Sequence, residues 1–97
     1  MRTEEVDDGR RGYRIVGRVQ GVGFRWWTRR TAVELGLAGW VRNEVDGSVV
    51  VHASGSADAL GMFEEALLRG PMGSRVERVE SLAPDASAEG GEFRNEA

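Results

Sequence analysis

The feature that limits the possible folds most strongly lies near the start of the chain. There the spacing of apolar residues changes from every second residue, typical of a strand, to helical spacing, across a short glycine-rich link. Residues 13–19 alternate in character, which predicts a strand with one buried face. Residues 24–35 show helical spacing, and Gly36 follows where a left-handed helix cap belongs. The side chains expected on or beside the apolar stripe of this helix are Trp26, Thr28, Ala32, Val33 and Leu35. Residues 20–23 are therefore predicted to turn a strand directly into a helix.

A second strand, a hairpin and a second helix are predicted downstream. Residues 39–43 and 48–53 are short strand-like segments on either side of Asp46-Gly47. This pair favours a type I′ hairpin turn, in which both central residues take positive φ. Ser56 predicts the N-cap of the helix, and Gly70-Pro71 predicts its end. The apolar stripe expected on this helix is Leu60, Phe63, Ala66 and Leu67.

The predicted order of elements is βαββαβ. Residues 75–82 supply the fourth strand, in which Val76 and Val79 break strict alternation and indicate a bend. Two right-handed split β-α-β crossovers place both helices on one face of an antiparallel sheet, the ferredoxin-like α+β sandwich. Phe93 is the candidate for a last short strand, although the segment around it is weakly patterned. We expect residues 1–10 to be a disordered lead-in and residues 11–97 to form a single domain.

Composition excludes several kinds of site. The 97 residues are 40% hydrophobic and 30% charged, as in an ordinary globular protein. The absence of cysteine excludes disulfides, thiolate nucleophiles and thiolate metal sites, and the single histidine, His52, excludes a histidine-rich metal site. We expect His52 to be structural, and we expect no metal and no cofactor. No apolar run approaches the ~18 residues of a membrane span, so no membrane partner is expected. Nothing in the sequence argues for export, so a cytoplasmic location is expected, and the small size and charged surface favour a monomer.

Charge is distributed unevenly along the chain. Arginine supplies all 13 basic residues. Residues 10–42 hold eight arginines and one acid, a net charge of +7, whereas residues 43–97 hold four arginines and 11 acids, a net charge of −7. A general preference for arginine explains most of these positions, but the first half still carries a positive field that attracts anions. The expected partner is therefore negative, either a phosphate ester or a nucleic acid.

The link between the first strand and the first helix, residues 19–25, has the chemistry of an anion site. Gly21 and Gly23 permit the φ values that turn consecutive backbone N–H groups to one side. Arg25 begins the helix, where the helix dipole disfavours a cation unless an anion lies between it and the amides. Guanidinium also matches phosphate oxygens in a two-pronged contact. On these residues alone, a plain tight turn remains the commoner interpretation.

Four segments together resemble one family. They are V-Q-G-V-G-F-R (19–25), L-G-L-x-G-W-V-R-N (35–43), D-G-S-V (46–49) and G-P-M-G-S-R-V-E-R-V-E (70–80). In composition and spacing they are similar to the acylphosphatase family, over about residues 12 to 82. The resemblance implies the ferredoxin-like sandwich and the metal-independent hydrolysis of a small acyl phosphate to carboxylate and inorganic phosphate.

The resemblance also implies a site. The phosphate-binding arginine of the family corresponds to Arg25, and the asparagine that orients the attacking water corresponds to Asn43. The backbone cradle for the phosphoryl group corresponds to Gln20, Gly21, Val22, Gly23 and Phe24. By the same resemblance, the substrate's own phosphate takes the proton of the water, and inorganic phosphate is both product and competitive inhibitor. Glu44 departs from the family pattern and places an acid next to the predicted site.

Two alternatives remain open at this level. Ferredoxin-like sheets also bind RNA, by stacking bases on aromatic side chains of the central strands. Residues 48–53 carry no aromatic side chain, and Trp26 and Trp27 fall on a helix, so we expect no nucleic-acid partner. The second alternative is a non-catalytic module that senses phosphate. Trp26 and Trp27 point about 100° apart on a helix, so at most one lies fully in the core, and the other is a candidate for the rim of the site.

Overall fold

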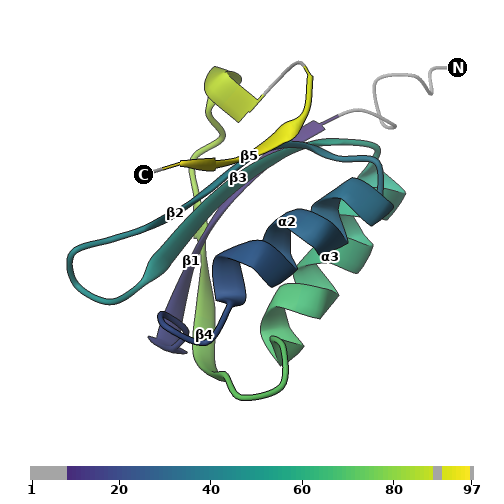
Figure 1. The fold of residues 1–97 in the computed structure, drawn as a ribbon. Coiled ribbons are helices and arrows are strands. Elements are labelled where there is room, and N and C mark those ends of the chain that lie inside the picture. The colour runs from purple at the N-terminus through teal and green to yellow at the C-terminus, as the bar shows by residue number, and fades with distance from the viewer. Residues whose placement is uncertain (1–8, 89–90, 97) are drawn as a thin grey trace, which may run out of the picture.

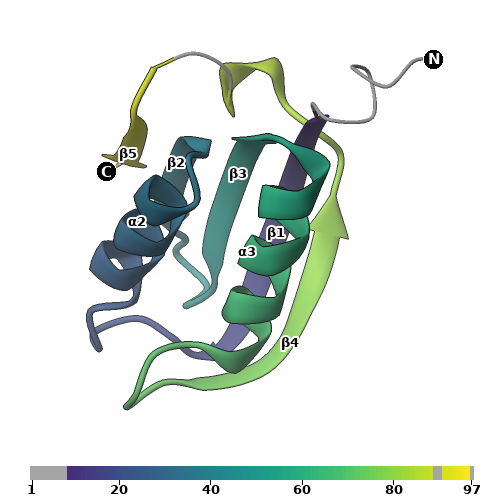
Figure 2. The same cartoon turned by 90° about the vertical axis from the view of Figure 1, so that its right-hand side faces the viewer.

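The protein folds into a five-stranded sheet with two helices packed on one face (Figures 1 and 2). The computed structural model describes residues 9–88 and 91–96, to which all structural statements refer. The strands lie in the order β4-β1-β3-β2-β5 across the sheet. In chain order the elements are β1 (Gly9–Arg18), α2 (Phe24–Glu34), β2 (Ala38–Asn43), β3 (Val49–Gly55), α3 (Ala57–Arg69), β4 (Arg75–Leu82), the short 3-10 helix η1 (Ala86–Ala88) and β5 (Phe93–Glu96).

The ferredoxin-like βαββαβ fold predicted from the sequence is confirmed, with one addition to the sheet. Strands β4, β1, β3 and β2 pair antiparallel, whereas β5 pairs parallel to β2. The sheet is therefore mixed rather than wholly antiparallel. Strand β1 begins at Gly9 and so includes two residues of the expected lead-in; the rest of that lead-in lies outside the described residues. No helix of the described part of the chain is long and apolar enough to cross a membrane.

The hydrophobic core lies between the sheet and the two helices. Tyr13 and Ile15 of β1 and Val51 of β3 are buried on the face that the helices cover. Phe63 of α3 meets the rings of Tyr13 and Phe93 edge to face, with centroids 6.3 and 6.2 Å away. The four residues predicted for the apolar stripe of α3 are all buried. The Ser56 side chain accepts a hydrogen bond from the Ala59 amide, which confirms Ser56 as the predicted N-cap.

The apolar stripe predicted for α2 is wrong for two of its members. Trp26 is 61% exposed and Val33 is 52% exposed. The buried face consists of Phe24, Thr28 and Ala32. The burial of Phe24 sets the rotation of the helix, and at 100° per residue a side chain two positions later points to the opposite side.

A bulge explains the broken alternation of β4. Val16 pairs with Arg78 and Gly17 pairs with Val76, so Glu77 has no counterpart in β1. Val76 and Val79 can therefore both pack against the core. The bulge is the irregularity that their broken alternation predicted. Gly17 is required there, because its φ is 139° and a Cβ atom would collide with the Arg75 carbonyl oxygen.

The β2–β3 hairpin forms where the sequence predicts it, but its turn is not type I′. A type I′ turn needs positive φ at both Asp46 and Gly47. Gly47 has a φ of 95°, but no described residue other than glycine has positive φ, so Asp46 does not meet this requirement. The Asp46 Oδ1 atom accepts hydrogen bonds from the Ser48 amide at 2.9 Å and the Ser48 hydroxyl at 2.6 Å. The Glu44 amide donates to the Ser48 carbonyl at 2.8 Å. The aspartate side chain thus stabilises a three-residue loop closed by a left-handed glycine.

His52 is a packing residue on the sheet face that the helices leave open. Its ring lies 4.9 Å from that of Trp40, and it fills the space opposite Gly12, where a Cβ atom would meet the imidazole. The Trp40 Nε1 atom donates to the Ser87 hydroxyl at 3.0 Å. His52 is 7% exposed, and burial lowers its pKa below the usual 6.5. Packing agrees with the structural role predicted from the sequence.

The lowered pKa of His52 predicts acid sensitivity. Below about pH 6.5 the unfolded chain binds a proton that the folded chain binds less readily, so the free energy of unfolding falls as the pH drops. Urea unfolding of the wild type between pH 8 and pH 5 should show this fall. His52→Gln should be less stable at pH 8 but should show a smaller pH dependence. The carboxyls of Asp46 and Asp85 have pKa values lowered from 3.8, so they titrate below this range. Equal pH dependence in both proteins would contradict the prediction.

Candidate active site

A cavity of about 230 Å³ lies where the link between β1 and α2 meets the ends of β2 and β5. It brings together side chains and main chain from three separate parts of the sequence. Its lining residues are Val19, Gln20, Gly21, Gly23, Phe24, Arg25, Trp26, Asn43 and Asn95. The structure thus gathers Arg25 and Asn43, which the sequence analysis named as the catalytic pair, around one cavity.

The backbone of the link is shaped as an anion site. Gly21 and Gly23 have φ values of 78° and 77°, both in the left-handed region. Gly23 is the N-cap of α2, and neither a side-chain cap nor an acidic residue occupies the first turn of that helix. In the described chain, no backbone hydrogen bond between elements has its donor in residues 20–26. These N–H groups are therefore left to bind an anion, which the positive end of the helix dipole also favours.

Arg25 contributes a positive charge to this cavity. It is the second residue of α2, and its Nη1 atom donates to the Glu96 carbonyl oxygen of β5 at 3.4 Å. No carboxylate of the described residues forms an ion pair with it. The charge of the guanidinium is thus not neutralised within the described protein, and most of its N–H groups remain for a ligand.

Asn43 contributes a neutral amide from a different element. It is the last residue of β2 and pairs with Val49 of β3, so the sheet fixes its backbone. Its side chain makes no hydrogen bond with a described residue and lines the cavity. An amide in this state can both donate to and accept from a water molecule.

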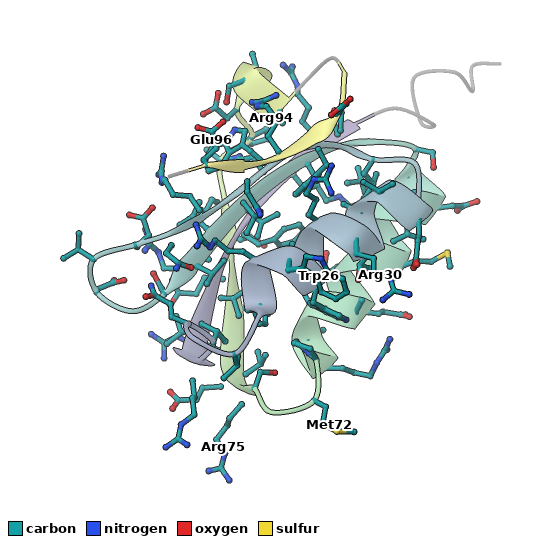
Figure 3. All side chains as sticks on the ribbon, viewed as in Figure 1. Trp26, Arg30, Met72, Arg75, Arg94 and Glu96 are labelled. Carbon is teal, nitrogen blue, oxygen red and sulfur yellow. The ribbon has the colours of Figure 1, made fainter. Side chains whose placement is uncertain are left out.

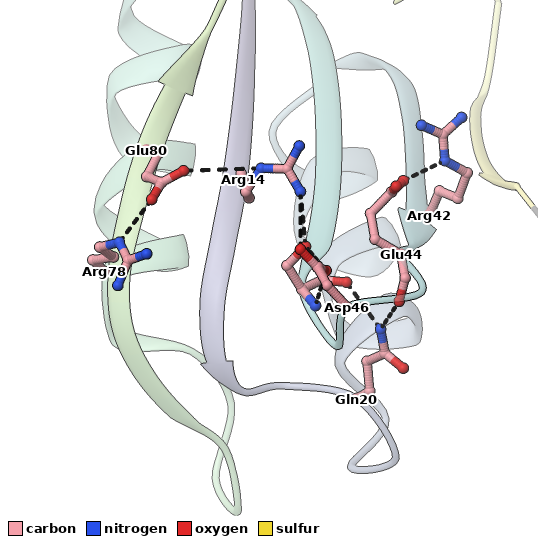
Figure 4. A network of polar contacts seen from close by, with 8 residues as sticks. Arg14, Gln20, Arg42, Glu44, Asp46, Arg78 and Glu80 are labelled. Atoms are coloured by element: carbon pink, nitrogen blue, oxygen red, sulfur yellow. Dashed lines mark hydrogen bonds and ion pairs between the residues drawn. The ribbon is translucent and has the colours of Figure 1, made fainter.

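The Gln20 side chain fastens the link to the hairpin. Its Nε2 atom donates to the Glu44 carbonyl at 2.7 Å and to the Ser48 carbonyl at 2.9 Å (Figure 4). The sequence analysis assigned only the backbone of Gln20 to the phosphate cradle and missed this contact. Because Glu44 follows Asn43 directly, the two hydrogen bonds hold the glycine-bent link and the asparagine at a fixed separation.

Two residues near the predicted site do not line the cavity. Val22, assigned to the backbone cradle, is partly buried against the hydrophobic core. The Glu44 carboxylate accepts a hydrogen bond from the Arg42 Nε atom at 2.7 Å and is absent from the cavity lining. The acid that departs from the family pattern is therefore paired with a neighbouring cation.

The structure adds Asn95 to the site. It lies in β5 opposite Val41, two residues beyond the buried Phe93, so both side chains project from the same side of the strand. In the sequence there is little indication that Asn95 belongs to the site, because the four residues of β5 are too few to show an alternating pattern. Parallel pairing with β2 is what brings Asn95 beside the cavity.

The chain is thus a small α+β sandwich whose first link places helix-start amides beside an arginine, an arrangement suited to an anion. The sequence model of the acylphosphatase family matches residues 11–94. The chain belongs to the acylphosphatase family.

Individual relatives agree with this assignment. An acylphosphatase of Nitratidesulfovibrio vulgaris (strain DP4) is 61% identical over 70 residues, which cover 72% of this chain and 70% of the relative. An acylphosphatase of Koribacter versatilis (strain Ellin345) is 52% identical over 85 residues, or 86% of this chain and 76% of the relative. The structure of an acylphosphatase from Coxiella burnetii superposes with a TM-score of 0.87 at 32% identity, covering 99% of this chain and all of the other. Together they support an acylphosphatase enzyme.

The two hydrogen bonds of Gln20 generate a prediction. Gln20→Ala removes two hydrogen bonds, while the Glu44 and Ser48 carbonyls keep their bonds from the Gly47 and Glu44 amides. At a net contribution of about 0.5–1.5 kcal/mol for each lost bond, the free energy of unfolding should fall by about 1–3 kcal/mol. The affinity for inorganic phosphate should fall several-fold, because the link is no longer held. Urea unfolding and calorimetric titration with phosphate measure the two effects. Val45→Ala, at the fully exposed tip of the same hairpin, is the control and should change stability by less than about 0.5 kcal/mol. Unchanged phosphate affinity in Gln20→Ala would limit Gln20 to a structural role.

Proposed function

We propose that this protein hydrolyses the carboxyl–phosphate bond of small acyl phosphates, releasing a carboxylate and inorganic phosphate without a metal ion. The observation that carries the proposal is the cavity itself, which combines the unpaired amides of the link, the Arg25 guanidinium and the Asn43 amide. The acylphosphatase relatives supply the reaction, and the cavity supplies groups suited to it.

In the proposed reaction, the phosphoryl group binds first. Its oxygens accept hydrogen bonds from the amides between Gln20 and Trp26, and from Arg25 on a second side. These donors are fixed before the substrate arrives, because Gly21 and Gly23 set the backbone and β5 holds the arginine. A guanidinium about 4 Å from a phosphate charge contributes roughly 4 kcal/mol at an effective dielectric constant of about 20. Such preorganised donors stabilise charge in the transition state.

Asn43 orients the water that attacks phosphorus. A new bond forms between the water oxygen and phosphorus, while the bond from phosphorus to the acyl oxygen breaks. The electron pair of that bond leaves on the carboxylate, and the water proton goes to a phosphoryl oxygen. Because a carboxylate is a weakly basic leaving group, positioning and charge stabilisation suffice. A neutral amide suits the position, since a carboxylate there would repel the phosphate.

Arg25 provides the first test. The wild type should hydrolyse benzoyl phosphate in the presence of EDTA, with inorganic phosphate as competitive inhibitor. Arg25→Ala should lose turnover and phosphate inhibition together, because one group serves both. Steady-state kinetics measure both quantities.

The matched control for Arg25 is Arg18→Ala. It removes the same charge from an exposed position one residue before the link and outside the cavity. We expect it to change turnover by less than about threefold, as an exposed charge in screening solvent should. Phosphate inhibition that persists in Arg25→Ala would show that the amides alone anchor the phosphate. A wild type inactive on acyl phosphates, or one that EDTA inactivates, would refute the proposed function.

Asn43 provides the second test. Asn43→Ala should lower turnover by about 10²–10³-fold, the size of one oriented polar group, while inorganic phosphate still binds. Asn43→Asp keeps the shape but adds a negative charge, so it should lose turnover and also bind phosphate less tightly. Kinetics and calorimetric titration separate the two variants. Full turnover in Asn43→Ala would remove this residue from the mechanism.

A further inference from the structure

Trp26 is an aromatic side chain exposed at the edge of the phosphate cavity. It is 61% exposed, whereas Trp40 is 7% exposed and Trp27 packs against the core. Tryptophan is among the side chains that bury the most area in cores and interfaces, so an exposed one leaves a large apolar surface in water. The Trp26 ring is not part of the described hydrophobic core, so its exposed surface is available to a ligand.

The ring joins two hollows of the surface. Trp26 lines the phosphate cavity, and it also lines a groove of about 410 Å³ on the outer side of α2. The other residues of that groove are Arg29, Arg30, Val33 and Glu34. Figure 3 shows Trp26 and Arg30 next to each other on this helix. A ligand that fills the phosphate cavity can thus continue across the indole without leaving the protein surface.

Neighbours on the helix hold the ring in place. The Arg30 guanidinium carbon lies 5.4 Å from the centroid of the Trp26 ring, a cation–π contact. The Arg30 Nε atom in turn donates to the Glu34 carboxylate at 3.3 Å, four residues along the helix. These exposed contacts favour one orientation of the Trp26 ring beside the cavity, each of them weakly.

The shape of an acyl phosphate directs its acyl group to this ring. Once the phosphoryl group sits against the amides and Arg25, the acyl group must extend out through the cavity mouth. Among the lining residues, Gln20, Asn43 and Asn95 are polar. Val19 and Phe24 are buried in the core, with 0% and 1% of their surfaces exposed. Trp26 is thus the large apolar side chain of the described lining that an acyl group can contact.

We propose that Trp26 is the acyl-group subsite of this protein and that it selects acyl phosphates with an aromatic acyl group over those with a small aliphatic one. The inference rests on the proposed function. A flat aromatic acyl group can stack on the indole, whereas an acetyl group is too small to cover it. Trp26 acts on specificity, and it takes no part in the transfer of the phosphoryl group.

The test compares two substrates in matched variants. In Trp26→Ala, kcat/KM for benzoyl phosphate should fall about five- to tenfold further than kcat/KM for acetyl phosphate, the size of one aromatic stacking contact. Trp26→Phe should restore most of the preference. Met62→Ala, which removes an exposed apolar side chain of α3 outside both the cavity and the groove, should keep the wild-type ratio. Equal losses on both substrates in Trp26→Ala would overturn the proposal, because the ring would then support the phosphate site rather than the acyl group.

A binding measurement separates this proposal from the proposed function. Phenacylphosphonate and acetonylphosphonate replace the bridging oxygen by a methylene group and cannot be hydrolysed in the same way. Calorimetric titration should show that the wild type binds the phenacyl compound more tightly and that Trp26→Ala loses this preference. Equal affinities in the wild type would overturn the subsite. If neither acyl phosphate is hydrolysed but the preference is present, the proposed function fails and the aromatic subsite stands.

Discussion

The burial of Phe24 is the constraint on which the site depends. Its side chain is 1% exposed and packs 5.4 Å from the Trp27 ring, so α2 begins directly after Gly23 and its rotation is fixed. Successive residues of a helix point 100° apart. With Phe24 in the core, Arg25 is directed to the cavity and Trp26 to its outer edge. One hydrophobic contact thus gives three neighbouring residues three different surroundings.

Folding pairs part of the positive first half of the sequence with the negative second half. Arg14 of the positive half lies 3.7 Å from the Asp46 carboxylate and 3.8 Å from that of Glu80, both in the negative half (Figure 4). Such partly exposed ion pairs contribute little to stability, about 0–1 kcal/mol each. Their effect is on the field around the molecule, because they neutralise arginines away from the site. Arg25 keeps its charge, so attraction for anions is directed to the cavity.

Sequence patterns predicted both α-helices, the four antiparallel strands and the link that carries the candidate site, but not the short 3-10 helix η1. These features follow from short-range periodicity and from the positions of glycine, both of which can be read within a single segment of the sequence. The errors concern contacts that hydrophobic periodicity does not record, whether between segments or within a turn. The direction of Trp26 depends on the depth to which Phe24 is buried, and the turn at Asp46 depends on a side-chain hydrogen bond to Ser48. Asn95 enters the site only through the parallel pairing of β5, which four weakly patterned residues cannot reveal.

The Gln20 anchor relies on acceptors that do not depend on side-chain identity. Both hydrogen bonds end on main-chain carbonyls, those of Glu44 and Ser48. Any amino acid at those two positions presents the same oxygen atoms, provided that the loop between them keeps its length. Position 44 is therefore free to change over evolution, and Val45 can accept a grafted surface residue, while Asp46 and Gly47 keep the shape of the turn. Insertions are a different matter, since an added residue would displace one oxygen from reach of the glutamine.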